Sequence, residues 1–258
     1  LTLFVVTFMD ITHRKENEKK LLNYNTELKK LNTDKDNFIR ILAHDLKNPL
    51  NSIIGFSEFI LTNFDNIDLE TIKEYTTIIN ESSVKTYELM EEILLWLKVQ
   101  YGKLNANPMD IGLYQITDGI ISILKPSAND KLLIIENNIP EDLIIKADLN
   151  MTKSIIINLI SNAIKYSLVS GRIIISAEKS DRDTKIIIQD FGIGMSEKEV
   201  EEIFHSNNTQ SKDGTMGEKG TGFGLLICYE LVIKQEGKIW VESKEGEGSK
   251  FIFTLPNL

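Results

Sequence analysis

The sequence is poor in the residues that build disulfide-linked domains and membrane spans. Cys228 is the only cysteine, so no disulfide can form within the chain, and a reducing compartment fits this count. There is no run of 18 or more apolar residues, so the pattern predicts no transmembrane helix within these 258 residues. The apolar stretch 3–6 is too short for a signal peptide and lacks the charged residues that precede one.

Positive charge is also in the minority. The chain has 29 Lys and Arg residues against 38 Asp and Glu residues. The net charge of −9 argues against non-specific nucleic-acid binding, which needs a basic surface. Apolar side chains make up 42% of the chain, enough for one or two domains with cores. Because the sequence starts at Leu1 rather than Met, we expect a cytoplasmic fragment whose membrane anchor, if it has one, lies upstream.

Histidine is scarce as well, and one of the three histidines lies in a helical pattern. Apolar residues at steps of three and four predict a helix through residues 41–54, and His44 lies off its apolar stripe. Asp45 follows directly, and Asn48 lies one helical turn beyond the histidine, near its side chain. Taken alone, His44 is most simply a surface histidine beside a carboxylate.

The first hundred residues have the pattern of long helices that need partners. Residues 15–37 carry a narrow heptad seam in a charged helix, which indicates a coiled coil that continues into the helix of His44. Asp68 is the expected N-cap of a second helix with an apolar face to about residue 99. We therefore expect residues 38–104 to form a helical hairpin that pairs with a second copy as a four-helix bundle. Residues 105–108 are the expected linker.

Residues 109–258 have a different pattern, in which short strands alternate with helices. Strands are expected near residues 109–111, 132–137, 143–146, 172–177, 184–189, 238–243 and 249–255. Helices are expected near residues 113–124, 148–167, 196–204 and 225–235, the third with a capping box of Ser196 and Glu199. This order predicts an α/β sandwich, in which helices cover one face of a sheet, with a glycine-rich loop at 205–221.

A row of polar residues interrupts one of these predicted helices. Asn158, Asn162 and Lys165 lie four and three residues apart, so they share one face of an otherwise apolar helix. Mg²⁺ accepts oxygen ligands such as an Asn carbonyl and keeps water or phosphate oxygens as its others. The row is therefore a candidate metal site, with an N-cap or a polar surface row as the alternative.

A second motif follows a predicted strand. Asp190 ends the strand and is followed by Gly192 and Gly194, which lack the side chains that would keep a ligand away from the backbone. The carboxylate can accept a hydrogen bond from an exocyclic amine. An ordinary turn is the alternative, since two close glycines are weak evidence.

A third motif opens the last predicted helix. It contains three alternating glycines, Gly220, Gly222 and Gly224. The free N–H groups and the positive dipole end of a helix favour a phosphate group at this place. A flexible linker is the alternative, and it is weaker because the glycines adjoin a helix.

In this order, the three motifs resemble the N, G1 and G2 boxes of the GHKL ATPase superfamily. The string from His44 and Asp45 to Asn48, Pro49 and Leu50 resembles the H box of sensor histidine kinases. The resemblance runs from about residue 30 to the end of the chain. It implies a dimerisation and histidine phosphotransfer domain at 38–104 and a Bergerat-type catalytic ATP-binding domain at 109–258. Residues 1–14 resemble the last strand and exit motif of PAS sensor domains.

The resemblance also implies a role for each site residue. His44 would be the phosphoacceptor, Asp45 would orient its imidazole, and Asn48 would take part in dephosphorylating a partner. The implied nucleotide residues are Asn162 for Mg²⁺ with Asn158 in support, Lys165 and Tyr166 for phosphate and nucleotide contacts, Asp190 for adenine, Gly192 and Gly194 for the pocket shape, and Gly220, Gly222 and Gly224 for the lid hinge and phosphates. The family's Phe-x-x-Phe element is reduced here to Phe204, and His205 is interpreted as a lid surface residue.

The implied activity is transfer of the γ-phosphoryl of ATP, bound with Mg²⁺, to His44 and then to an aspartate of a response-regulator receiver domain. Phosphatase activity toward that regulator is also implied, and a homodimer is the expected assembly. A GHKL ATPase that hydrolyses ATP for conformational work is one alternative, against which the hairpin with His44 argues. A catalytically inactive signalling scaffold is another, against which the complete set of ATP-site residues argues.

Overall fold

The computed structural model describes residues 12–100, 105–204, 212–218, 220 and 222–257. Several side chains of the first helix, including those of His44 and Asp45, are not among those described. The predicted PAS-like segment 1–14 lies outside the described residues except for residues 12–14, which are helical. Residues 1–44 and 45–258 form two separate compact units. None of the described helices is long and apolar enough to cross a membrane.

Two long helices make up the N-terminal part of the chain. Helix α1 covers Thr12–Asn63 and continues through Pro49, as the predicted continuity of the coiled-coil segment and the following helix requires. Helix α2 covers Leu69–Gln100. Asp68 caps it as predicted, because its carboxylate accepts hydrogen bonds from the backbone N–H and the hydroxyl of Thr71, both at 2.8 Å. These bonds lower the pKa of Asp68.

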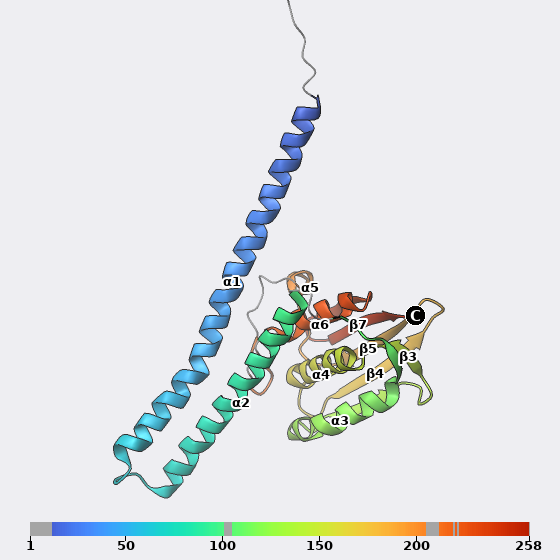
Figure 1. Ribbon diagram of the computed structural model, residues 1–258. Helices are drawn as coiled ribbons and strands as arrows, with labels where there is room; N and C mark the ends of the chain where they lie inside the picture. The colour runs from blue at the N-terminus through green and yellow to red at the C-terminus, as the bar shows by residue number, and fades with distance from the viewer. Residues whose placement is uncertain (1–11, 101–104, 205–211, 219, 221, 258) are drawn as a thin grey trace, which may run out of the picture. The chain divides into compact units, whose positions relative to one another are not determined.

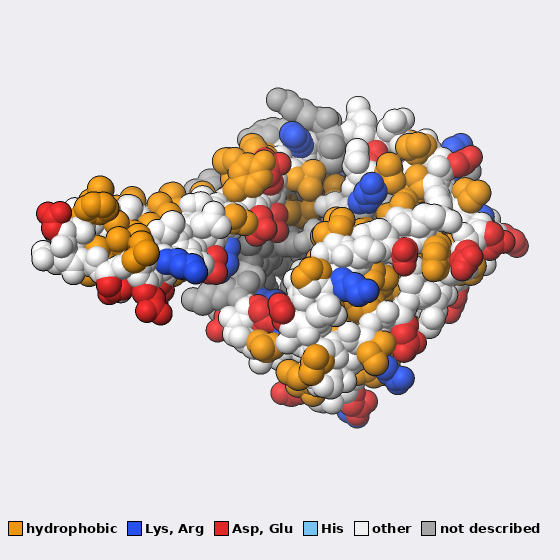
Figure 2. All heavy atoms as spheres, turned by 90° about the horizontal axis from the view of Figure 1, so that it is seen from below, with side chains coloured by type: hydrophobic (Ala, Val, Ile, Leu, Met, Phe, Trp, Pro, Cys, Tyr) orange, Lys and Arg blue, Asp and Glu red, His pale blue; other side chains and the backbone are white. Residues whose placement is uncertain are grey.

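The end of α1 and helix α2 form the predicted hairpin (Figure 1). The rings of Phe56 and Phe59 pack on Tyr75, with centroids 4.9 and 5.2 Å from it. Apolar side chains nevertheless remain on the hairpin surface (Figure 2), namely Leu50, Ile54, Phe59, Leu61, Phe64, Leu69, Val84, Tyr87, Met90 and Leu94. So much exposed apolar surface indicates a site of protein association.

The C-terminal part contains a five-stranded sheet and a separate two-stranded one. The larger sheet has the order β2-β4-β5-β7-β6, in which β2 and β4 are parallel and the other pairs antiparallel. Its strands are β2 (Ile134–Asn138), β4 (Arg172–Lys179), β5 (Asp183–Asp190), β6 (Lys238–Lys244) and β7 (Gly248–Pro256). The smaller sheet pairs β1 (Met109–Gly112) antiparallel with β3 (Ile144–Ala147).

Three helices cover one face of the larger sheet, so the predicted α/β sandwich is confirmed (Figure 1). They are α3 (Leu113–Asp130), α4 (Leu149–Tyr166) and α6 (Gly224–Lys234), and the short helix α5 (Glu197–Glu202) follows β5. Helix α3 extends past its predicted end near residue 124, although Pro126 lies inside it. Pro126 is exposed, so water can bond the carbonyl that proline leaves without an N–H partner.

Helix α4 lies at the centre of the core. Four of its side chains, Ile155, Ile156, Leu159 and Ile160, are fully buried. Cys228 of α6 is also fully buried, and its thiol donates to the Ile155 carbonyl with a sulfur–oxygen distance of 3.8 Å. Burial raises the pKa of this thiol.

The predicted linker is joined to the α/β domain at its C-terminal end. The backbone N–H of Asn107 donates to Oδ2 of Asp148 at 2.9 Å, and the Asp148 N–H donates to the Gln235 side chain at 2.9 Å. Strand β1 starts two residues after Asn107. The chain is thus fixed to the α/β domain from Asn107 onward.

Candidate functional site

The polar row of the first motif lies on α4, whose start and orientation follow from the sequence. Asp148 caps the helix by accepting the N–H groups of Asn150 and Met151 at 3.0 and 2.9 Å. The buried apolar residues then fix its rotation about its own axis. Asn158 and Asn162 are consequently half-buried on a face that borders a cavity.

The two asparagines differ in their hydrogen bonds. The Asn158 amide nitrogen donates to the Ser154 carbonyl at 3.0 Å, which leaves its side-chain oxygen for other contacts. Among the described residues, no hydrogen bond reaches the side chain of Asn162. Two amide oxygens on the border of one cavity form a donor set that suits a hard cation such as Mg²⁺.

Asp190 ends strand β5 and points toward the helices. Side chains alternate between the faces of a strand, so Asp190 continues the series of the buried Ile186 and Ile188. It is 3% exposed, and its Oδ1 accepts the N–H groups of Gly192 at 2.9 Å and Ser249 at 3.3 Å. Burial raises the pKa of Asp190 to about 6 although these hydrogen bonds act in the opposite direction. Both bonds end on Oδ1, so Oδ2 is the oxygen left for a ligand.

The loop after Asp190 lies directly against the C-terminal end of α4. The Ile193 N–H donates to the Tyr166 carbonyl at 3.2 Å. A Cβ atom at Gly192 would lie 2.0 Å from that same carbonyl oxygen, so only glycine fits at this position. Gly194 has a φ of +64°, which side chains disfavour. The second motif therefore shapes the backbone beside the α4 end.

The glycines of the third motif adjoin α6. Gly224 is the first residue of that helix, and Gly222 has a φ of +75°. Gly220, Gly222 and Gly224 all line the same cavity as the α4 row. The three motifs, which are far apart in sequence, thus meet at one place.

The cavity has a volume of about 330 Å³. Every predicted nucleotide residue except Gly192 lines it, and Gly192 lies next to it in the Asp190 loop. Pockets for small ligands range from about 300 to 1,000 Å³ and combine apolar walls with a few polar groups. The apolar walls here include Ile193, Met195 and Phe251.

Several of the lining residues could not be predicted from the motifs. Ser249 reaches Asp190 only because β7 pairs with β5, and no local signal marks it. Lys212 lines the cavity and forms an ion pair with Glu199. This partner and the Ser196 hydrogen bonds of the capping box lower the pKa of Glu199 to about 2.

The reduced Phe-x-x-Phe element has a packing partner. Phe204 lies against Tyr229 of α6, with ring centroids 6.2 Å apart. His205 lies outside the described residues. Of the H-box residues, His44 and Asp45 lie on α1 with side chains outside those described, whereas Asn48 is described and exposed.

Two family models match this chain, one after the other. Residues 34–102 match the His Kinase A (phospho-acceptor) domain. Residues 147–258 match the histidine kinase-, DNA gyrase B- and HSP90-like ATPase. The first segment holds His44 and the hairpin, and the second holds the cavity of the three motifs. The chain belongs to the sensor histidine kinases.

The similar proteins and solved structures described next are histidine kinases. The cell-division control histidine kinase PdhS of Brucella suis is 28% identical over 267 aligned positions, which include 98% of this chain. The chain spans about a quarter of the length of that relative, 26%. The Acinetobacter baumannii histidine kinase AdeS has a similar fold, with a TM-score of 0.66 and 19% identity over 83% of this chain and 98% of that one.

A further similar fold comes from a kinase that was solved with a partner. The histidine kinase ThkA in complex with the response regulator protein TrrA has a TM-score of 0.63 and 23% identity. The match covers 98% of the present chain and 68% of the ThkA chain. At this identity the likeness establishes the shared fold.

Proposed function

We propose that this chain phosphorylates His44 with ATP and passes the phosphoryl group to an aspartate of a response-regulator receiver domain. The observation that carries the proposal is the convergence of Asn162, Lys165 and Asp190 on one cavity, in a chain whose first helix bears His44. Phosphoryl transfer needs little covalent chemistry from a protein, which mainly positions the reactants and neutralises charge.

The cavity residues fall into two groups, one that contacts the adenine and one that contacts the phosphates. Asp190 Oδ2 accepts the adenine amine, with Gly192 and Gly194 shaping the adenine pocket. Lys165, Tyr166 and the glycines Gly220, Gly222 and Gly224 contact the phosphates. Asn162, supported by Asn158, would hold Mg²⁺ through its side-chain oxygen, where the ion would neutralise phosphate charge.

His44 is the nucleophile in this proposal. A neutral imidazole has one N–H and one lone pair. The Asp45 carboxylate accepts a hydrogen bond from the N–H at Nδ1, which leaves the Nε2 lone pair to attack the γ-phosphorus. A nitrogen–phosphorus bond forms as the bond from the γ-phosphorus to the ADP oxygen breaks, and ADP leaves with that electron pair.

The proposed partners follow from the hairpin and from the family. A second copy of the chain covers the apolar hairpin surface, so the domain at 38–104 forms a four-helix bundle, preceded by a coiled coil at 15–37 and followed by the linker at 105–108. The complex of ThkA with TrrA supports a receiver domain as the second partner. Asn48, exposed one turn from His44, would orient water for dephosphorylation of that partner. A cytoplasmic location is part of the same proposal.

Incubation with γ-labelled ATP and Mg²⁺ tests the reaction. The wild type is expected to retain label that is lost in acid and kept in base, as a phosphoramidate would be. His44→Gln is expected to retain none. Asn48→Ala is the matched variant on the same helix, and it is expected to keep the label while losing phosphatase activity toward a phosphorylated receiver domain.

Each other outcome contradicts a specific part. Label on His44→Gln would place the acceptor elsewhere. Release of phosphate without label would indicate an ATPase, and neither label nor release would indicate a scaffold. Equal loss of both activities in Asn48→Ala would remove the phosphatase role.

A further inference from the structure

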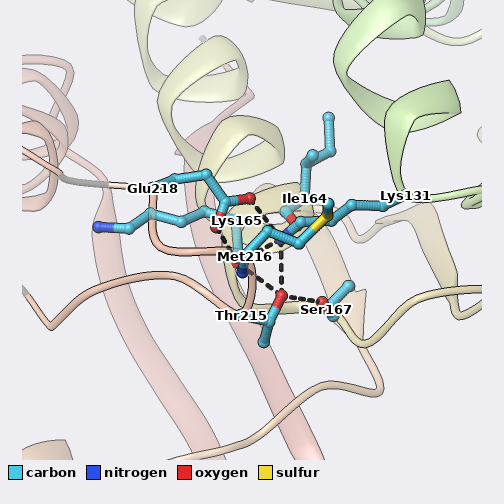
Figure 3. A network of polar contacts seen from close by, with 7 residues as sticks. All are labelled: Lys131, Ile164, Lys165, Ser167, Thr215, Met216 and Glu218. Carbon is cyan, nitrogen blue, oxygen red and sulfur yellow. Dashed lines mark hydrogen bonds and ion pairs between the residues drawn. The ribbon is translucent and has the colours of Figure 1, made fainter.

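Lys131, at the C-terminal end of α3, is a buried cation next to the nucleotide site. It is 2% exposed. Its Nζ donates to the carbonyls of Ile164 at 2.9 Å and Lys165 at 2.7 Å and to the Thr215 hydroxyl at 2.7 Å, and it lies 2.5 Å from Oε1 of Glu218 (Figure 3). An ammonium group has three N–H donors, so these four oxygens occupy all of them.

Two of these oxygens belong to the last turn of α4. The last carbonyls of a helix have no N–H partner within it and lie at the negative end of its dipole. Lys131 supplies both a donor and a positive charge for the carbonyls of Ile164 and Lys165. The same turn carries Lys165 and Tyr166, whose side chains line the cavity. The ammonium therefore fixes the backbone from which two cavity residues project.

The other two oxygens belong to the turn at residues 214–218. The Thr215 N–H donates to the Lys165 carbonyl at 3.1 Å, and the Thr215 hydroxyl donates to the Ser167 carbonyl at 2.6 Å. Glu218 closes the turn, since its Oε2 accepts the Met216 N–H at 2.9 Å. No side chain of this turn is buried, and Met216 is 59% exposed. Polar contacts, with Lys131 at their centre, thus hold the turn on the domain.

Glu218 is ionised in this arrangement. Burial acts to raise the pKa of Glu218, but the hydrogen bonds from Lys131 and from the backbone of Glu218 and Met216 outweigh it, so the pKa is lowered. An unpaired buried ammonium would be strongly unfavourable, whereas a carboxylate and three further oxygens compensate its lost hydration.

We propose that Lys131 is a positioning residue for the nucleotide phosphates. It ties the 214–218 turn to the end of α4, and this turn leads within a few residues to Gly220, Gly222 and Gly224 at the start of α6. The carboxylate on the adenine side is held by different elements, because β5 and β7 position Asp190 and Ser249. The loop after Asp190 also bonds the end of α4, but through the Tyr166 carbonyl rather than through the two carbonyls that Lys131 binds. This inference rests on the proposed binding of ATP, and it predicts that loss of the Lys131 charge weakens phosphate contacts selectively.

Lys131→Met tests the inference, because Met fills much of the same space without the charge. We expect the dissociation constant of a non-hydrolysable ATP analogue to rise about 10-fold, within the range of couplings between neighbouring sites. Adenosine, measured by displacement, is expected to bind within about twofold of wild type, because its contacts lie on the Asp190 side. The matched control is Lys185→Met, which removes a lysine from the exposed ion pair with Glu178 and is expected to change neither constant.

Glu218→Gln, alone and combined with Lys131→Met in a double variant, tests whether Lys131 acts through the turn at 214–218. If it does, the double variant binds the analogue no more weakly than Lys131→Met alone. Thr215→Val serves if Lys131→Met does not fold, and it is expected to weaken the analogue and spare adenosine in the same way. An equal loss for both ligands, or wild-type affinity in a folded Lys131→Met, would overturn the inference. Failure of the wild type to bind the analogue would instead contradict the proposed function.

Discussion

The buried carboxylate of Asp190 destabilises the protein while no ligand is bound. Its ordinary pKa of 3.8 is raised to about 6 by burial. Between these two values the folded protein retains a proton that the unfolded chain has already lost. The free energy of unfolding therefore falls as the pH rises from about 4 to about 6, and it stays lower above that window.

Asp190→Asn is expected to separate stability from binding. Asn keeps the Oδ1 acceptor for Gly192 and Ser249 but carries no charge, so the free protein should gain on the order of 2–3 kcal/mol near pH 7. Its stability should no longer vary between pH 4 and 6 from this cause. Urea unfolding at pH 4 and pH 7 measures both effects. ATP-analogue binding should be lost, because an amide NH₂ faces the adenine amine, and retained binding would contradict the role of Asp190.

Sequence motifs identified Asp190 and its neighbour Gly192, but not Ser249, which also bonds Asp190, or Lys131, which bonds the end of α4. The carboxylate lies beside two glycines at the end of an alternating strand, which is a local pattern. Ser249 and Lys131 have no such pattern, since each reaches its partners through tertiary contacts. Ser249 lies 59 residues along the chain from Asp190, and Lys131 lies 34 residues from Lys165 of α4, whose carbonyl it bonds. A lysine at a helix end is ordinarily a solvated surface residue. Its burial here follows from the loop and helix ends that happen to surround it.

At the scale of elements, the sequence predicted the linker at 105–108 and a strand near 109–111, and strand β1 does start at Met109. The helices and strands were predicted in the right order, because the alternation of apolar residues distinguishes period 3.6 from period 2. The pairing of β1 with β3 could not be predicted in the same way, because it brings together segments that are far apart in the sequence. The extension of α3 past Pro126 could likewise not be foreseen from a proline that usually ends helices.

Strand β1 is expected to be part of the folded ATP-binding domain, not of the linker, and therefore to contribute to the stability of that domain. Ile111 is 4% exposed and pairs with Ile145, so Ile111→Ala should lower the free energy of unfolding by about 2–4 kcal/mol. Met109→Ala on the same strand, where the side chain is 48% exposed, should change it by less than about 0.5 kcal/mol. Thermal unfolding of the full chain measures both, and equal effects would mean that β1 is not part of this core.

At the scale of the whole molecule, the hairpin surface predicts the assembly. Leu50, Ile54 and Leu61 are spaced four and seven residues apart, so they share one face of α1, and each is more than 40% exposed. Ile54→Glu should place a charge in the proposed dimer interface and shift the protein to single chains of 29.4 kDa. Light scattering of the purified chain measures the mass. Thr62→Glu, which adds the same charge at an exposed polar position off that face, should leave a dimer. A dimeric Ile54→Glu would contradict this interface.

The thiol of Cys228 can report how often the core of the α/β domain opens to solvent. Reagents that alkylate cysteine need a solvent-accessible thiolate, and Cys228 is fully buried with a raised pKa. Its rate of alkylation therefore measures how often α6 separates from α4. A nucleotide that binds across these two helices should slow that rate in proportion to its occupancy. Conversely, cysteines introduced on the surface can carry spectroscopic labels without removal of the native one.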